Sequence, residues 1–213
     1  MDLYVPFNAV KPATISYNGT ASATVTASTF TFTPFPLGTA AANRKVIIGV
    51  VYNSATAVNS VTVGGTSATQ IASNGACSFW VLDVPTGTTA TIVVTMASAI
   101  VGCAIAGWAA YGLRTSTAVG SGSATATATV HTLDATAFQG GVVVGVSAQT
   151  TAVLSTTTWS GLSMDQPAVG IGFGVGQSIS AASAQVTAGG SPRAMSVTWT
   201  VSNPTRSLAA ALF

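Results

Sequence analysis

The stretch Val46–Tyr52 holds seven consecutive residues without a charge or a strongly polar side chain, and a polar turn and a Ser/Thr/Val alternation follow it. Such a run is typical of a strand buried on both faces, of part of a membrane span, or of a strand covered by another chain. Elsewhere apolar and polar positions alternate, as in residues 91–97, which indicates half-buried strands. Val, Thr and Ile are frequent, whereas the helix formers Glu and Lys are absent or nearly so. The sequence therefore predicts an all-β protein.

Turn signals divide the first half of the chain into short segments. They are Asn18-Gly19, Gly64-Gly65, Asn74-Gly75 and Val84–Gly87, in which Asn and Gly supply positive φ and Pro85 presets a turn residue. The strands expected between them cover residues 13–18, 23–33, 45–53, 58–71, 77–84, 88–97 and 101–112. Strands this short and this regularly punctuated favour an antiparallel sandwich, jelly roll or barrel over a parallel α/β sheet.

The second half of the chain repeats the order of the first. Val46–Val50 falls on Val142–Val146 after a shift of 96 residues, and Ile92 falls on Val197 after a shift of 105. A period of about 100 residues is too long for a solenoid and suits a duplicated sandwich. We therefore expect two tandem, similar antiparallel β-sandwiches of the jelly-roll or Ig-like kind, either separate or merged into one larger sandwich. The expected divisions are an extended arm over 1–12, a first sandwich over 13–113, a linker over 114–124 and a second sandwich over 125–213.

A membrane span is the competing interpretation of residues 92–113, which carry no charge. Their length meets the criterion of about 20 apolar residues for a spanning helix. However, the alternation within residues 91–97 and the glycines at 102, 107 and 112 disagree with a helix. The whole chain has only ten formal charges, so a long uncharged segment discriminates poorly. A sandwich strand is the preferred prediction.

The scarcity of charge also limits the chemistry that the chain can perform. Charged residues make up 5% of it, against about 25% in an ordinary domain. The few cations are scattered, which argues against a nucleic-acid surface. His131 is the only histidine, with Asp134 nearby, but no nucleophile elbow accompanies them. We predict no catalytic residue, no cofactor and no metal site, and interpret His131 as a strand residue near the surface, at the position of Phe30 or Phe32.

Cysteine and tryptophan positions leave alternatives open. Cys77 and Cys103 are isolated, which favours buried thiols over a redox or zinc site, and a disulfide between them is not decided by the sequence. The four tryptophans, Trp80, Trp108, Trp159 and Trp199, lie in apolar or alternating runs. Core packing is the preferred interpretation of these residues, and exposed platforms for sugar binding are the alternative.

The N-terminal segment has no counterpart before the second half. Leu3, Tyr4, Val5 and Phe7 are apolar, and Pro6 and Pro12 favour an extended chain. Such an arm can pack along another subunit and form backbone hydrogen bonds with an exposed sheet edge, so these four residues are the candidate subunit interface. A frayed terminus or a first sandwich strand is the alternative. Asp2 stands where a signal peptide carries positive charge, so synthesis in the cytoplasm is expected.

A family resemblance follows from several of these motifs. Arg44-x-Val46 and its apolar strand, then SVTVGGTSAT, FWVLDVPTGTTATIVVT and GWAAYGL, resemble small β-sandwich structural proteins of tailed bacteriophages, of the head-decoration, fibre or tail type. The resemblance implies a non-enzymatic virion component present in multiple copies, a homo-oligomer whose partners are capsid, portal or tail subunits, without nucleic-acid binding or membrane insertion. The alternative is a carbohydrate-binding, adhesin-like module; an enzyme that depends on His131 comes third.

Overall fold

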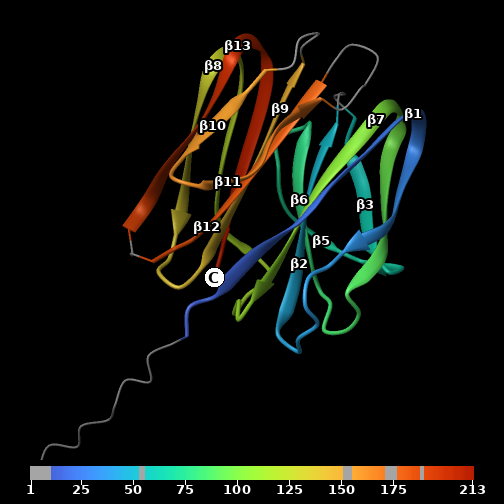
Figure 1. Cartoon of the computed structure of the whole chain (residues 1–213), viewed down its shortest axis with the longest axis vertical. Helices are drawn as coiled ribbons and strands as arrows, with labels where there is room; N and C mark the ends of the chain where they lie inside the picture. Colours follow the sequence, from blue (N-terminus) through green and yellow to red (C-terminus); the bar gives the residue numbers. More distant parts are fainter. Residues whose placement is uncertain (1–10, 53–55, 151–154, 171–176, 188–189) are drawn as a thin grey trace, which may run out of the picture.

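The protein consists of two antiparallel sheets in a computed structural model that describes residues 11–52, 56–150, 155–170, 177–187 and 190–213 (Figure 1). The first sheet contains β1 (Thr14–Pro36), β2 (Arg44–Tyr52), β3 (Val58–Val63), β4 (Thr66–Ser67), β5 (Thr69–Ser73), β6 (Cys77–Asp83) and β7 (Thr89–Tyr111). The second contains β8 (Ala118–Ala137), β9 (Val142–Thr150), β10 (Thr157–Ser160), β11 (Ser163–Gly170), β12 (Gln177–Gln185) and β13 (Gly190–Leu212). The predicted all-β, antiparallel fold is confirmed.

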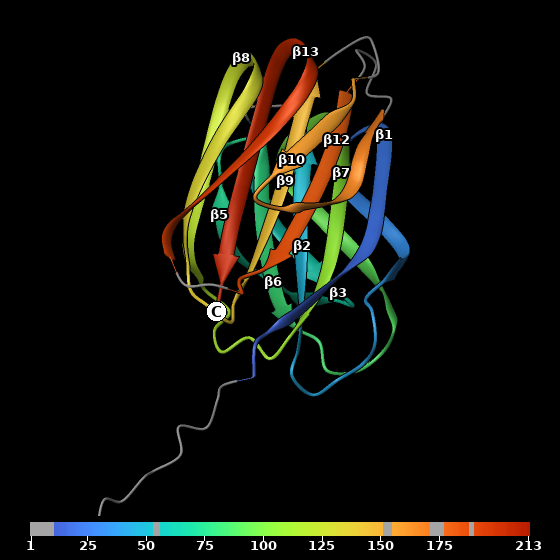
Figure 2. The same cartoon turned by 60° about the vertical axis from the view of Figure 1, so that its left-hand side comes forward.

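The two sheets have the same strand order. The first runs β4-β3-β7-β2-β6-β5, with β1 paired to β7, and the second runs β10-β13-β9-β12-β11, with β8 paired to β13. In each half the last strand, β7 or β13, is long and lies within the sheet. The first strand of the half, β1 or β8, pairs along it. Figures 1 and 2 show the two sheets side by side, each curled around its own interior.

Long bent strands replace several of the short strands that the sequence predicts. β1 and β7 have 23 residues each, so the predicted pairs 13–18 with 23–33, and 88–97 with 101–112, are single strands. Asn18-Gly19 is not a turn but a register irregularity inside β1, where Gly19 has a φ of 136°. The first part of β7 pairs with β3 and its last part with β2, so the strand bends between two layers of the same sheet.

Three hydrophobic cores result from this bending. One lies inside the first sheet and includes Val46, Ile48 and Val50, and another lies inside the second sheet and includes Val143. The third lies between the two sheets, where Ile47 and Val51 of β2 meet Val142, Val144 and Val146 of β9. Because successive residues of a strand point to opposite faces, Val46–Tyr52 of β2 and Val142–Val146 of β9, which have a core on both sides, are apolar at every position. Val46–Tyr52 is thus a doubly buried strand.

The connection between the two halves is shorter than the sequence predicts. β7 ends at Tyr111 and β8 begins at Ala118, so most of the Gly/Ser-rich stretch assigned to the linker is strand. Of residues 92–113, considered as a membrane span, all but the last two belong to β7, which ends at Tyr111. Across the described ranges, no helix has the length and apolar character needed to cross a membrane.

A buried arginine fixes the loops at one end of the first sheet. Arg44 is 1% exposed, and its guanidinium donates to the backbone carbonyls of Leu37, Gly38, Val84, Thr86 and Gly87 at 2.7–3.3 Å. Five carbonyl dipoles surround this charge in place of a carboxylate, and they tie the loop after β1 to the turn before β7. The turn predicted at Val84–Gly87 is present there, with Gly87 at a φ of 71°.

Candidate functional site

Both ends of the described chain meet at one end of the molecule, here called the basal end (Figure 1). Ala13 donates its N–H to the Gly140 carbonyl at 2.7 Å, and its own carbonyl accepts from the Gln185 amide at 2.8 Å. The Phe213 carbonyl accepts from the backbone N–H groups of Arg114 and Thr115. The start of β1 is therefore held to the loop between β8 and β9, and the connection between the halves is held to the end of β13.

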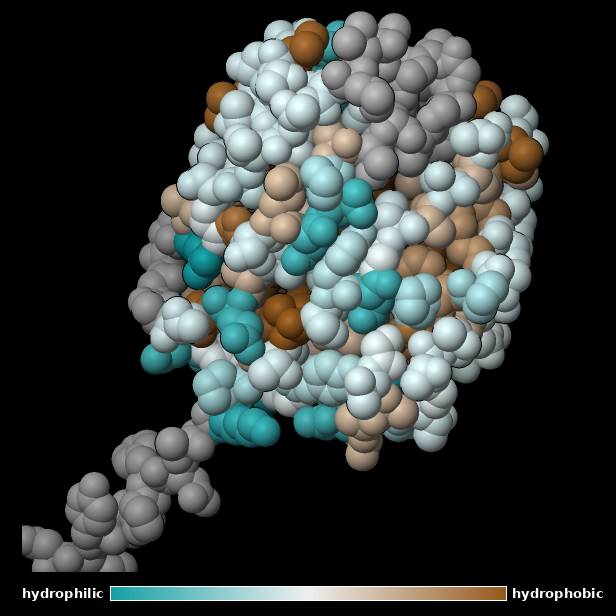
Figure 3. Space-filling view, viewed as in Figure 1, coloured by the Kyte–Doolittle hydropathy of each residue, from teal (hydrophilic) through white to brown (hydrophobic). Residues whose placement is uncertain are grey.

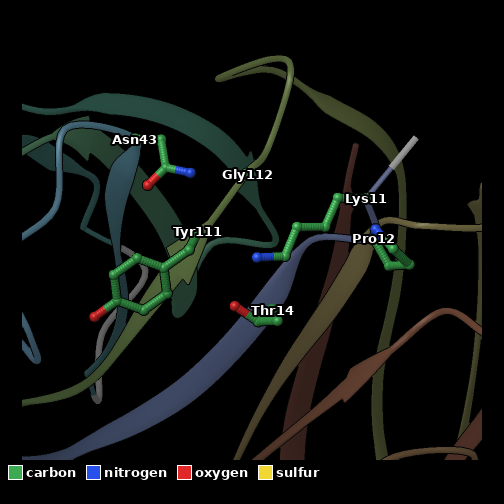
Figure 4. Close-up of a pocket in the computed structure, with 6 residues that line it drawn as sticks. All are labelled: Lys11, Pro12, Thr14, Asn43, Tyr111 and Gly112. Atoms are coloured by element: carbon green, nitrogen blue, oxygen red, sulfur yellow. The ribbon is translucent and has the colours of Figure 1, made fainter. Parts of the chain in front are cut away.

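One pocket of about 240 Å³ opens at the basal end (Figure 4). Its lining consists of Lys11, Pro12, Thr14, Asn43, Tyr111 and Gly112. Figure 4 shows the Lys11 side chain extending toward Tyr111, with its ammonium group beside Thr14. The Tyr111 hydroxyl donates to the Thr39 carbonyl at 2.8 Å, which fixes the ring. With an ammonium, an amide and a hydroxyl and no acidic lining residue, the pocket suits a carboxylate or carbonyl oxygen.

A second pocket of about 380 Å³ lies on the other side of Pro12. Arg114, Gln139, Gly140 and Phe213 complete its lining. The Arg114 guanidinium lies 5.0 Å from the centre of the Phe213 ring, within the range of a cation–π contact. Phe138 meets the same ring edge-on at 5.8 Å and is 49% exposed. The basal end therefore combines two cations with three aromatic rings, drawn from separate segments of the chain.

Charge is concentrated at this end. Lys45 forms an ion pair with Asp83 and donates to Ser116 at 2.7 Å, close to the ends of β2 and β6. Lys11 and Arg114 line the two basal pockets. The outer faces of both sheets carry many hydroxyls, as in the facing pairs Thr29–Thr95 and Thr132–Ser196 and the pair Thr158–Thr198, and the exposed Asp134 of β8 is a charged exception. In Figure 3 most of the visible surface is pale, and the strongly hydrophilic atoms are few.

A polar cluster joins the two sheets at the side of their shared core. The indole N–H of the fully buried Trp108 donates to Asp165 Oδ2 at 2.7 Å, and Ser183 also hydrogen-bonds to this carboxyl. Burial raises the pKa of Asp165, and the two hydrogen bonds oppose that rise. Tyr17, whose hydroxyl donates to Gln166 Oε1 at 3.1 Å, also has a raised pKa because of burial. The cluster connects β1 and β7 with β11 and β12.

His131 lies inside the second sheet, so its predicted place near the surface is wrong. It is 2% exposed and pairs with Val197, just as Phe32 pairs with Ile92 in the first sheet. Its Nδ1 lies 3.0 Å from Ser207 Oγ, which lies 2.7 Å from Ser147 Oγ, and Nε2 has no hydrogen-bond partner among the described residues. Burial lowers the pKa of His131, which favours the neutral ring.

The geometry around His131 is that of an interior polar network. Trp199 donates its indole N–H to Ser147 Oγ at 3.0 Å and closes one side of the network. Asp134, the acid suggested by sequence proximity, is exposed, whereas His131 and Leu133 point inward. The contact between His131 and Ser207 thus has the distance of a base–nucleophile pair, but both side chains are buried.

The remaining predicted residues have clear positions. Trp80, Trp108 and Trp199 are buried, which confirms the core interpretation for these three, and Trp159 is partly buried with its indole N–H on Ser180 Oγ at 2.9 Å. Cys77 and Cys103 are free buried thiols, not a disulfide. The four predicted interface residues, Leu3, Tyr4, Val5 and Phe7, lie outside the described residues.

The basal aromatic and cationic residues were not among the sequence predictions. Tyr111, Phe138 and Phe213 stand at the ends of different strands, so no local pattern brings them together. Comparison of the chain with protein-family models and with curated proteins finds no match.

Proposed function

We propose that the chain is a non-enzymatic structural protein of a tailed-phage virion, present in multiple copies as a capsid decoration or a fibre or tail component. The observation that carries this proposal is the distribution of charge. The charged side chains Lys11, Lys45, Asp83 and Arg114 gather at the basal end, while the outer faces of the sheets present many hydroxyls and the exposed Asp134.

Neutral hydroxyl faces are suited to close packing against neighbouring subunits. Burying a charge in an interface is costly unless it is paired, and the cores of protein interfaces are depleted of charged residues. A surface of Thr and Ser avoids that cost and still forms hydrogen bonds. The same surface gives a monomer little of the charge that ordinarily keeps proteins apart in solution.

The basal end supports attachment to other virion proteins. Its pockets offer Lys11 and Arg114 to an incoming carboxylate or carbonyl group, and Phe138 offers exposed apolar area. Arg and aromatic residues are enriched among the residues that contribute most to binding energy at interfaces. Capsid, portal or tail subunits are the partners that this proposal assigns to that end.

Carbohydrate binding is the second candidate, and the exposed basal aromatics favour it. Three of the four tryptophans are buried, so they cannot stack on a sugar. The available rings are Phe138, Phe213 and Tyr111, with the side chains of Arg114 and Gln139 beside them. Binding of the protein on a glycan array, abolished by Phe138→Ala, would favour this candidate over the virion protein.

The mass of the tag-free protein in solution tests the proposed function. We expect light scattering to give a stable trimer, pentamer or larger ring over a wide range of concentrations. A monomer at every concentration would contradict a self-assembling subunit. Electron microscopy of the same sample would show whether the particles have the closed symmetry expected of a virion component.

A further inference from the structure

The free edge of β1 is the longest unpaired strand edge in the first sheet. β1 spans 23 residues and, in the part of the chain that the structure describes, forms a ladder with β7 alone. An antiparallel ladder uses only alternate backbone groups of an edge strand, and the remaining N–H and C=O groups point away from the sheet. Such a row is a template for another extended chain.

Charge and internal proline, two of the devices that usually protect sheet edges, are missing from most of β1, although register irregularities interrupt its ladder with β7 at Ala23/Thr26 and Ala27/Thr29. No charged residue occurs between Lys11 and Arg44, and the prolines of the strand, Pro34 and Pro36, stand only at its end. β8, the corresponding strand of the second sheet, carries the exposed Asp134. Natural edge strands are commonly blocked by lysine, proline or inward-pointing charge, and residues 21–33 of β1 contain none of these.

The accessible part of this edge is residues 21–33. Before it, Tyr17 is hydrogen-bonded to Gln166 of β11, and the second sheet lies close. Within it, Ala21, Ala23 and Ala27 only partly cover the core of the first sheet, and Val25 is 60% exposed. Figure 3 shows tan and brown atoms on the side of the molecule where β1 runs, among paler surroundings. An added strand with apolar side chains would cover this area.

The chain itself contains a segment of matching chemistry. Residues 3–10 are uncharged, and Leu3, Val5 and Phe7 recur at the period of two that places side chains on one face of a strand. Pro6 is compatible with an added edge strand, where one N–H can face solvent. Ten extended residues span at most about 33–36 Å, enough to cover much of residues 21–33.

The anchoring of Ala13 argues against pairing of this segment with β1 of its own copy. Ala13 is held through both its N–H and its carbonyl, by Gly140 and by the Gln185 side chain. A hairpin between residues 1–10 and β1 of the same chain would have to reverse at this fixed residue and pass the stretch beside Gln166. We infer that residues 1–10 of one copy add as a β-strand to residues 21–33 of β1 in a second copy. This inference rests on the proposed multi-copy function and names the surface that joins the copies.

Mixed single-cysteine variants test the inference directly. Val5→Cys protein is mixed with Thr24→Cys or Ser28→Cys protein under mild oxidation, so that any disulfide between the two sites joins different copies. Thr24 and Ser28 are exposed on β1, and Thr125 is the matched exposed position on β8. We expect a crosslinked dimer with a β1 site and at most one-tenth as much with Thr125→Cys. Equal crosslinking at β8, or none at either β1 site, would overturn the inference.

Deletion of residues 1–10 separates the failure of this inference from that of the proposed function. We expect the truncated protein to unfold at the same temperature as the full chain and to become monomeric. If the full chain is oligomeric and the truncated protein keeps the same mass, the arm-to-β1 contact is wrong while the multi-copy function stands. If the full chain is itself monomeric, both are wrong.

Discussion

The indole N–H of Trp108 donates to Asp165 Oδ2 at 2.7 Å, across the boundary between the two sheets. Trp108 is fully buried, so its N–H has no alternative partner unless water enters. We predict that Asp165→Ala unfolds more easily than Asp165→Asn by about 1–3 kcal/mol, the cost of leaving a buried donor unsatisfied. Both variants lose the charge, and only Asn retains an acceptor. Urea unfolding of the two measures the difference, and equal stabilities would mean that water replaces the carboxyl oxygen.

The same carboxyl gives the stability a defined pH dependence. Burial raises the pKa of Asp165 in the folded protein, so the folded state holds this proton more tightly than the unfolded state. The stability that protonated Asp165 contributes to the folded state is therefore fully present below the pKa of the unfolded state, about 3.9. It is lost as the pH rises through the higher pKa of the folded state. We expect the Asp165→Asn protein to lack this decline. Thermal unfolding of both proteins across that pH window tests it, and parallel curves would contradict the assignment.

Gly49 lies on β2 at a position that faces Val146 of β9 across the shared core. A Cβ at this position would lie 2.8 Å from Val146 Cγ1 and 3.0 Å from the Phe79 ring, both in the shared core. We predict that Gly49→Ala destabilises the protein by about 1–3 kcal/mol, as overpacking does. The double variant Gly49→Ala/Val146→Ala should lose less than the sum of the two single losses, because the removed methyls make room. Additive losses in denaturant unfolding would show that the contact is relaxed elsewhere.

Gly49 and Gly145, which align in the internal repeat, also show why the sequence predicts the fold better than it predicts which face of a strand each side chain is on. Alignment places Gly49 on Gly145, but Gly49 faces Val146 in the shared core, whereas Gly145 faces Trp159 and Leu162 inside the second sheet. A shift of one residue reverses every side chain of a strand. The aligned segments Val46–Val50 and Val142–Val146 are apolar on both faces, so their sequences do not indicate which side chains face the shared core. Alignment by identity therefore misplaces the register by one residue.

Some features of the structure can be predicted from the local sequence, and others cannot. The turns at Gly64-Gly65 and Asn74-Gly75 are present, because positive φ is a local requirement that Gly meets. The joining of β7 across residues 97–102 was missed because a glycine such as Gly102, which has a φ of 87° inside the strand, is typical of turns as well as of bends in a strand. The basal pockets depend on tertiary proximity between Lys11, Tyr111 and Phe213, which no single stretch reveals.

The two thiols should be unreactive in the folded protein. Cys77 and Cys103 are fully buried, and burial raises the pKa of Cys77 to about 12 and that of Cys103 further still. The thiolate is the reactive form, so we expect no rapid reaction with a disulfide reagent at pH 8 and two equivalents after denaturation. Rapid labelling of the native protein would show that the core around these thiols opens. The same result matters for the crosslinking test, which requires that only introduced cysteines react.

Arg44 should be among the least replaceable residues of the first sheet. Its side chain satisfies carbonyls from two loops at once, and no other described side chain reaches them. Arg44→Met keeps the length of the side chain but leaves buried acceptors unpaired, and we predict a loss of about 3 kcal/mol or more. Arg44→Lys should recover only part of that loss, because one ammonium cannot match the planar fork of the guanidinium.

Lys11→Met is the matched control for the loss of a cation, since Lys11 is exposed at the same end of the molecule. It should change the free energy of unfolding by less than about 0.5 kcal/mol. Denaturant unfolding of the three variants gives the comparison. If Arg44→Met unfolds at the same denaturant concentration as Lys11→Met, water can solvate the loop carbonyls. The guanidinium would then not be what ties the loop after β1 to the turn before β7.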